Sequence, residues 1–216
     1  FERGPESAYT AEDAVGPVMA LAIVDVDLDG RLDLFEGREY RQYGVLSNCG
    51  VDRLWRGDGE GGFEDVTREA GLWTAEAPGQ DDSSRPTYGV THADVDGNGW
   101  PDLLALSYGR QWNRLGLAQE DGTFRDVGRA SGFAGDAITH GRYPEWVGRP
   151  PEPPFRSNGN TFDCAVGDVD GDPDLDPFLG EIQHAWAGEA SDPTSLLVNE
   201  GEGFTRRPVQ ELLPPR

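Results

Sequence analysis

The amino-acid sequence predicts an all-β protein made of about three four-stranded repeats, on three observations. A short acidic segment occurs three times, beginning at Asp25, Asp94 and Asp168, at intervals of about 70 residues. Each copy lies between short apolar runs of the kind that form buried strands. Glycine (30) and proline (16) are too frequent for a helical bundle, because both destabilise helix interiors. Repeats of this length with several short strands each indicate β-propeller blades.

Each repeat is expected to run as strand, acidic loop, strand and hairpin. In the first repeat, apolar residues 19–24 lead into the acidic loop and residues 32–35 lead away from it. Segments with a glycine-rich turn follow at 53–67, 113–127 and 195–204, and each is typical of a hairpin. Four strands per repeat is the content of one propeller blade.

The predicted organisation is a single partial propeller domain over residues 1–216, with repeats at approximately 19–72, 88–133 and 160–205. Two long loops rich in glycine and proline, 73–87 and 134–159, separate them, and surface loops of this kind often carry specific function. Three blades do not close a propeller, which typically needs about four to eight. We therefore expect the chain to be part of a larger propeller, completed by another protein chain or by the rest of a longer chain.

The charge balance narrows the class of partner. Asp and Glu number 40 against 18 basic residues, all of them Arg, for a formal net charge of −22. A surface this acidic repels phosphate backbones, so we do not expect nucleic acid to be a partner. The sequence holds no apolar run long enough to span a membrane. Clustered carboxylates instead suit hard divalent cations.

The acidic segments have the spacing of calcium-binding loops. Carboxylates at positions 1, 3, 5 and 9 of a tight loop can converge on one ion, and a glycine at position 6 allows the sharp turn. Without a cation, such a cluster suffers like-charge repulsion. The predicted ligands are Asp25, Asp27, Asp29 and Asp33 in the first loop, Asp94, Asp96, Asn98 and Asp102 in the second, and Asp168, Asp170, Asp172 and Asp176 in the third.

The third loop departs from this pattern. Pro173 stands where glycine belongs, and proline cannot adopt the positive φ that the turn uses. We expect a weaker or distorted site there. An EF-hand is the competing interpretation, since residues 25–36 also fit its loop pattern, but EF-hands require flanking helices and these flanks look like strands.

The acidic segments, followed by Arg-Leu and Gly-x-Gly-x-Phe hairpins, resemble the FG-GAP/VCBS repeats of integrin α-subunit-like β-propellers. The resemblance implies a calcium ion in the loop that joins the first two strands of each blade, so two to three ions in this chain. It also implies an extracellular setting and a role in adhesion or ligand binding. Main-chain carbonyls of Arg31, Trp100 and Asp174 would complete the ligand shells under this resemblance.

These features favour a calcium-stabilised binding or assembly module that is secreted, periplasmic or on the cell surface, without catalysis of its own. The alternative is a carbohydrate-active lyase or hydrolase built on the same propeller, and carbohydrate is a candidate ligand in either case. A converging cluster of His140, Arg142, Tyr143 and His184 would favour the enzyme. His92, near the second loop, is expected to be a packed side chain. Cys49 and Cys164 permit one disulfide or two buried thiols.

Overall fold

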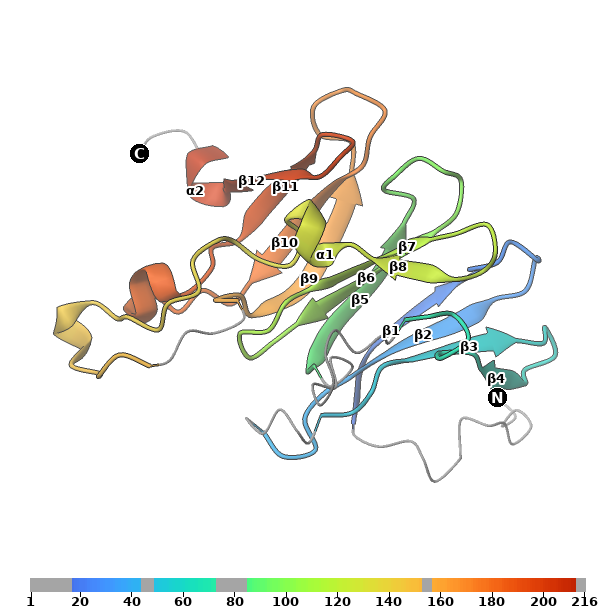
Figure 1. The fold of residues 1–216 in the computed structure, drawn as a ribbon, viewed down its shortest axis with the longest axis horizontal. Helices are drawn as coiled ribbons and strands as arrows, with labels where there is room; N and C mark the ends of the chain where they lie inside the picture. The colour runs from blue at the N-terminus through green and yellow to red at the C-terminus, as the bar shows by residue number, and fades with distance from the viewer. Residues whose placement is uncertain (1–16, 44–48, 73–84, 153–156, 213–216) are drawn as a thin grey trace, which may run out of the picture.

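The computed structural model describes residues 17–43, 49–72, 85–152 and 157–212, and its regular structure is nearly all β (Figure 1). Three four-stranded antiparallel sheets follow one another along the chain, which confirms the predicted fold class. Their strands are β1 (Val18–Val24), β2 (Asp33–Arg38), β3 (Arg53–Gly57) and β4 (Phe63–Asp65); β5 (Thr87–Ala93), β6 (Asp102–Ser107), β7 (Arg114–Ala118) and β8 (Phe124–Asp126); and β9 (Thr161–Gly167), β10 (Asp176–Glu181), β11 (Ser195–Asn199) and β12 (Phe204–Pro208).

Helical structure is confined to short pieces. The α-helices are α1 (Gly128–Ser131) and α2 (Val209–Leu212), and 3₁₀ turns form at Glu145–Val147 and Ala185–Ala190. None of the helices in the described ranges is long and apolar enough to cross a membrane. Of the two long loops, 73–87 lies mostly outside the described residues, whereas the described part of 134–159 contains one 3₁₀ turn and a bridge between Gly141 and Glu152.

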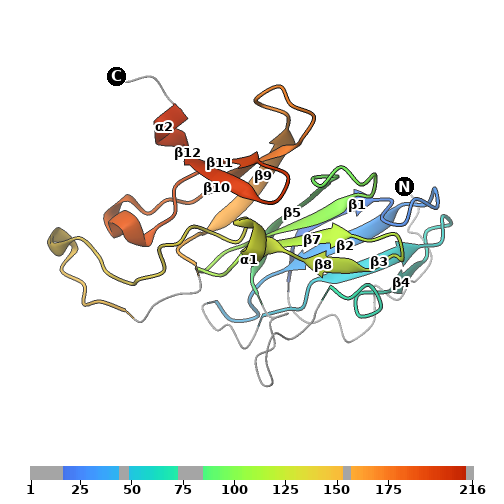
Figure 2. The same cartoon turned by 45° about the horizontal axis from the view of Figure 1, so that its top comes forward.

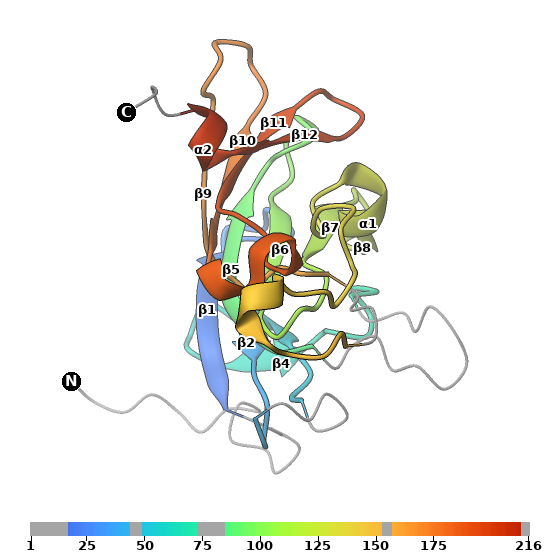
Figure 3. The ribbon, with the colours of Figure 1, turned by 90° about the vertical axis from the view of Figure 1, so that its left-hand side faces the viewer.

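The three sheets stack side by side as successive blades. Strand β1 contacts β5, and β5 contacts β9, so the first strands of the sheets lie together while the later strands diverge (Figures 2 and 3). All three acidic loops join the first strand of a sheet to its second, and they project from the same end of the molecule (Figure 1). The described residues form an open arc of blades, not a closed ring.

Two apolar cores lie between the blades. Phe35 and Leu54 of the first sheet pack with Leu103 and Ala105 of the second. Leu104 and Leu106 face the other way, toward the third sheet. This alternation follows from the period of two along a strand, and it explains why β6 is buried at every residue. Full burial of each such leucine contributes about 1.5–3 kcal/mol.

The outward side of strand β1 is apolar and largely exposed in the described part of the chain. Met19, Leu21 and Ile23 alternate along β1 and are 45%, 55% and 63% exposed. Their neighbours Ala22 and Val24 point into the core and are buried. A strand that is apolar on both faces is typical of an interior blade, since solvated strands carry polar residues on one face.

A hydrogen bond recurs between successive blades at the end opposite the acidic loops. Asp52, just before β3, accepts the hydroxyl proton of Thr87 at 2.7 Å. Asn113 holds the equivalent place before β7, and its amide donates to Thr161 Oγ1 at 3.0 Å. The same two side chains also accept a main-chain N–H from the end of the neighbouring strand, Arg38 at 2.8 Å for Asp52 and Ser107 at 2.8 Å for Asn113. Each side chain therefore ties its own sheet to the next.

Replacement of Thr87 by valine is expected to destabilise the fold by about 1–3 kcal/mol, because the fully buried Asp52 carboxylate loses a hydroxyl donor. Thr205→Val is the matched control, since Thr205 lies exposed on β12 and should change stability little. Urea unfolding of the two variants measures the difference. Equal midpoints for both would show that the inter-blade bond contributes nothing.

The structure decides between two pairs of alternatives that the sequence left open. Cys49 and Cys164 are both free and buried, and burial raises the pKa of each thiol to about 12. The EF-hand interpretation is wrong, because strands flank all three acidic loops. Glu36, which would be the last EF-hand ligand, is fully buried in β2, where it accepts a hydrogen bond from Trp55 and pairs with Arg38.

Candidate metal centre

Each acidic loop gathers carboxylates into a small volume. One oxygen from each of three side chains lies within 4.8 Å of the others in every loop. The groups found among the described residues are Asp25, Asp27 and Asp29; Asp94, Asp96 and Asp102; and Asp168, Asp170 and Asp176. All of these are predicted ligands. The predicted ligands Asp33, Asp172 and Asp174 lie outside the groups. Asn98 belongs to none of them because the groups contain carboxylates and Asn98 is an amide.

The first carboxylate shapes the first two loops in the same way. Asp25 accepts the main-chain N–H groups of Asp29 at 3.0 Å and Gly30 at 2.9 Å. Asp94 accepts those of Asn98 at 3.0 Å and Gly99 at 2.8 Å. These hydrogen bonds fold the backbone around the first side chain, so the protein's own contacts hold the loop in a tight turn.

The third loop loses this contact because Pro173 has no N–H to donate. Asp168 instead accepts a bond from Gly171, at position 4, at 2.7 Å. The positive φ angles show the same departure. Gly30 and Gly99, at position 6, have φ of 86° and 90°, a conformation closed to proline. The predicted distortion of the third loop thus has a defined origin in its sixth residue.

The fifth side chain makes one contact that all three loops share. Its oxygen accepts the N–H of the residue at position 7, whose carbonyl is a predicted ligand. The donors are Arg31 to Asp29 at 2.8 Å, Trp100 to Asn98 at 2.8 Å, and Asp174 to Asp172 at 3.0 Å. An Asx turn of this kind fixes the local backbone and explains why asparagine serves as well as aspartate at this place.

The ninth carboxylate has a structural role that the sequence pattern did not reveal. Asp102 is fully buried, and its two oxygens accept the N–H groups of Val95 in the loop and Ala118 at the end of β7, both at 2.8 Å. Asp33 and Asp176 repeat the arrangement with Val26 and Gly57, and with Val169 and Asn199. Each ninth aspartate therefore fastens its loop to the third strand of the same blade.

Burial shifts the protonation of Asp33 and Asp102. Removal from water raises the pKa of Asp102 to about 6, although the hydrogen bonds from Ala118 and Val95 act to lower it. Burial raises the pKa of Asp33 as well, again against two backbone hydrogen bonds. The negative charges of Asp94 and Asp96 add to the upward shift at Asp102, as expected for carboxylates that share a site.

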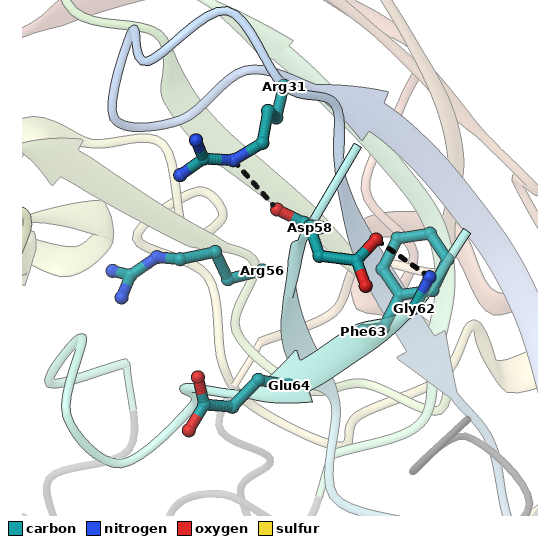
Figure 4. A pocket seen from close by; sticks show the side chains of 7 residues that line it. Arg31, Arg56, Asp58, Gly62, Phe63 and Glu64 are labelled. Carbon is teal, nitrogen blue, oxygen red and sulfur yellow. Dashed lines mark hydrogen bonds between the residues drawn. The ribbon is translucent and has the colours of Figure 1, made fainter. Parts of the chain in front are cut away.

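Two arginines reach the first loop, a feature missed by the sequence analysis. Arg31 pairs with Asp29, and Arg56 Nε lies 3.1 Å from Asp27 Oδ2. Both line an open hollow of about 530 Å³, in which Arg31 also donates to the carbonyl of Gly57 at 3.2 Å (Figure 4). Glu64, from β4, lies on the same hollow. Sequence spacing gave no signal for Arg56, which comes from a strand far from the loop in sequence.

The donor set fits a hard cation. Asp27 Oδ1 is buried and has no hydrogen-bond partner, so it is an acceptor without a donor inside the loop. Oxygen-only ligands are what calcium prefers, and the remaining valences of a shell of about six to eight oxygens are open to water and carbonyls. The third loop offers three grouped carboxylates but lacks the turn made by glycine in the other two.

The residues proposed to favour an enzyme converge only in part. Tyr143 and His184 line one cleft, at the other end of the molecule from the acidic loops. His140 instead faces Glu189 at 3.6 Å, and its Nδ1 accepts the N–H of Arg142. His92 was expected to be a packed side chain, but this prediction is wrong, because His92 is exposed on β5. The four-residue cluster named for a catalytic centre is therefore not assembled.

A second group of buried acids lies outside the acidic loops. Asp192 is almost fully buried beside Asp136 and Glu181, with Arg206 as the nearby cation. Burial raises the pKa of Asp192 to about 7, and the charges of Asp136 and Glu181 push it in the same direction. Between pH 4 and 7 the folded state holds a proton that the unfolded chain releases, so stability falls as pH rises through this window.

Asp192→Asn is therefore expected to leave stability unchanged near pH 4 and to raise it at pH 8, by an amount on the order of 1–3 kcal/mol. The amide has the same shape and carries no charge at any pH. Thermal melts of both proteins between pH 4 and 8 measure the effect. A difference that stays constant over the range, or that shrinks as pH rises, would contradict the assigned ionisation.

Comparison with known families bears on part of the chain. Residues 25–105 match the family model described as FG-GAP-like repeat. The matched segment begins at the first acidic loop, runs through the first hairpin and the second acidic loop, and ends within β6. The resemblance drawn from these motifs is confirmed for this segment. No curated protein sequence matches the chain.

Proposed function

Because residues 25–105 carry an FG-GAP-like repeat, we propose that this chain is a calcium-stabilised β-propeller module that binds or assembles with another molecule and has no catalysis of its own. The observation that carries the proposal is the recurrence of a three-carboxylate group in the same loop of each blade. The buried, unpartnered Asp27 Oδ1 supports it, since a bound cation would satisfy that oxygen.

The proposed ligands are the side chains at positions 1, 3, 5 and 9 and the carbonyl at position 7 of each loop. Calcium would neutralise the clustered negative charge and hold the two flanking strands together. In the first loop, an ion competes with Arg31 and Arg56 for the same carboxylates, so the second loop fills first. The third loop, with Pro173 at its turn, binds most weakly.

The uncovered face of β1 supports the assembly role. Met19, Leu21 and Ile23 form an exposed apolar surface where a further blade would pack in a closed propeller. That blade would come from another protein chain or from the rest of a longer chain. Calcium loops of modest affinity are filled where calcium is abundant, which favours a secreted, periplasmic or cell-surface location and a role in adhesion or ligand binding.

Native mass spectrometry in the presence of calcium tests the metal assignment. Two to three bound ions are expected, and the position-three variants Asp27→Ala, Asp96→Ala and Asp170→Ala should each lose the ion of their own loop. Asp121→Ala is the matched control, because Asp121 is an exposed acid in the β7–β8 turn that accepts hydrogen bonds from Thr123 and lies outside the acidic loops. A protein without calcium, or variants that keep the full complement, would sink the proposal.

A further inference from the structure

A cleft of about 660 Å³ opens at the end of the sheets opposite the acidic loops. Its lining comes from segments that follow the second strands of all three blades: Tyr40 after β2, Tyr108 after β6 and His184 after β10. A cleft of this size is within the range of small-molecule sites, about 300–1,000 Å³. No acidic-loop residue takes part in it, so the cleft is separate from the proposed calcium sites.

One wall of the cleft is a set of tyrosines. Tyr43 is 71% exposed, and its hydroxyl lies 3.0 Å from that of Tyr108. The Tyr40 ring lies 5.6 Å from that of Tyr43 and supports it from the buried side. Behind Tyr108, the rings of Tyr88 and Phe162 lie 4.8 and 5.4 Å away. This packing holds the exposed ring faces in place, which lowers the entropy that a ligand must overcome on binding.

The other wall combines aromatic rings with a cation. The Trp186 ring lies 5.5 Å from Tyr143 and 5.6 Å from His184. The Arg149 guanidinium sits over both Tyr143 and Trp186, at 4.9 and 5.1 Å from their ring centroids. These cation–π contacts orient the guanidinium, and its Nη2 pairs with Glu152 Oε1 of the same cleft at 2.6 Å. The Arg149 side chain is 48% exposed, so its other N–H groups face the cleft and solvent.

The floor of the cleft holds an unsatisfied acceptor. Gln111 is only 5% exposed, and its Oε1 is buried without a hydrogen-bond partner, while its amide nitrogen donates to the carbonyl of Gly109 at 3.3 Å. Buried polar atoms are rarely left unpaired, so an orphaned oxygen on the wall of a cleft points to a ligand that donates an O–H or N–H.

The backbone beside Gln111 is held in an unfavourable conformation. Arg110 has φ of 61°, next to Gly109 at 72°, and a non-glycine residue in this region is strained. The strain is fixed from a distant segment, because the Arg110 N–H donates to the carbonyl of Gly159 at 3.1 Å. Asn160 Oδ1 also accepts the N–H of Gly109 at 3.1 Å. Two guanidinium groups, Arg110 and Arg149, and one carboxylate, Glu152, line this cleft, so it carries an excess of positive charge in a chain of net charge −22. Arg110 donates to the Tyr143 hydroxyl at 3.1 Å.

We propose that this cleft binds an acidic carbohydrate, a sugar whose ring carries a carboxylate. The C–H face of a pyranose packs on aromatic rings such as the exposed Tyr43 and the half-buried Trp186, which both line the cleft. A ring hydroxyl supplies the donor that Gln111 Oε1 lacks, and the carboxylate pairs with the Arg149 N–H groups that Glu152 does not use. An acidic peptide would satisfy the charge but would leave the stacked rings without a flat partner. The inference rests on the proposed binding role and is independent of the calcium sites.

Isothermal titration calorimetry with trigalacturonate tests the proposal, in buffer saturated with calcium. Galactotriose of the same linkage serves as the neutral probe and hexaglutamate as the acidic peptide. Trigalacturonate is expected to bind, and Trp186→Ala and Arg149→Gln should each weaken its binding about tenfold or more. Trp146→Ala and Arg142→Gln are the matched controls. Both side chains are exposed in the same stretch of chain and lie outside the cleft, so binding should be unchanged.

Each result bears on the proposal directly. Failure of trigalacturonate to bind, equal binding of galactotriose, or stronger binding of hexaglutamate would overturn it. Equal losses in the cleft variants and in their controls would also overturn it. Melting temperatures of the variants identify any that fail to fold, and the exposed Arg149→Gln remains informative if Trp186→Ala does not. The calcium count by native mass spectrometry should be the same in every cleft variant, so failure of the metal assignment would be seen separately.

Discussion

Chelation of calcium with EDTA is expected to lower the melting temperature of the protein by roughly 5–10 °C for each ion released. A calcium concentration of about a hundred times the dissociation constant stabilises the folded state by about 2.7 kcal/mol. In a chain of this size, each kcal/mol of lost stability lowers the melting temperature by about 2–4 °C. Without the ion, Asp25, Asp27 and Asp29 repel one another within one small loop.

Scanning calorimetry with calcium, with EDTA and after calcium is restored measures this loss and its reversal. The shift should be smaller in Asp96→Ala than in the parent protein, because that variant has one ion fewer to lose. Magnesium is a matched control, since it prefers a rigid octahedral shell and should replace calcium poorly in these loops. An unchanged melt in EDTA would contradict a stabilising role for calcium.

Asp102→Ala is expected to be the most damaging substitution in the second blade, at a cost of roughly 3–6 kcal/mol even without calcium. The change leaves two buried N–H groups without an acceptor, those of Val95 and Ala118, which donate to the carboxylate at 2.8 Å. Hydrogen bonds to a charged acceptor contribute about 1.5–3 kcal/mol each, and both are lost together. Asp102→Asn keeps one acceptor oxygen, so its stability should lie between that of the parent protein and that of Asp102→Ala.

Urea unfolding in EDTA separates this structural role from metal binding. Under these conditions Asp96→Ala should be about as stable as the parent protein, because it removes one of the repelling charges. The Asn98 N–H, which loses its 3.2 Å bond to Asp96, keeps Asp94 as an acceptor at 3.0 Å. Asp102→Ala should remain strongly destabilised. If the two variants lost the same stability in EDTA, the ninth carboxylate would have no special place in the fold.

The sequence was sufficient for the blade pattern because that pattern is local. Short apolar runs on either side of each acidic loop predict β1 and β2, and the glycine turns predict the hairpins, without reference to distant residues. The distortion at Pro173 was predictable for the same reason, since proline carries its constraint within one residue. Calcium itself stays a prediction, supported by the convergence of the side chains.

Contacts between distant segments could not be predicted from the spacing of residues in the sequence. The pairing of Arg56 with Asp27 depends on the β2–β3 register, and the bond from Thr87 to Asp52 depends on how two sheets pack. The cleft is a stronger example, because Tyr40, Tyr108 and Trp186 come from three different blades. Tyrosine and tryptophan are equally common in apolar cores, so composition alone did not distinguish a ring that faces solvent from one that is packed.

The ninth aspartates also provide an internal reporter of loop occupancy. Each carboxylate joins an amide inside an acidic loop to an amide at the end of a third strand, as in Val95 with Ala118 and Val169 with Asn199. If a loop loosens, the hydrogen bonds of these amides weaken, including those at the third strand of the blade. Their exchange with deuterium would register each blade separately, at residues that are not themselves proposed ligands.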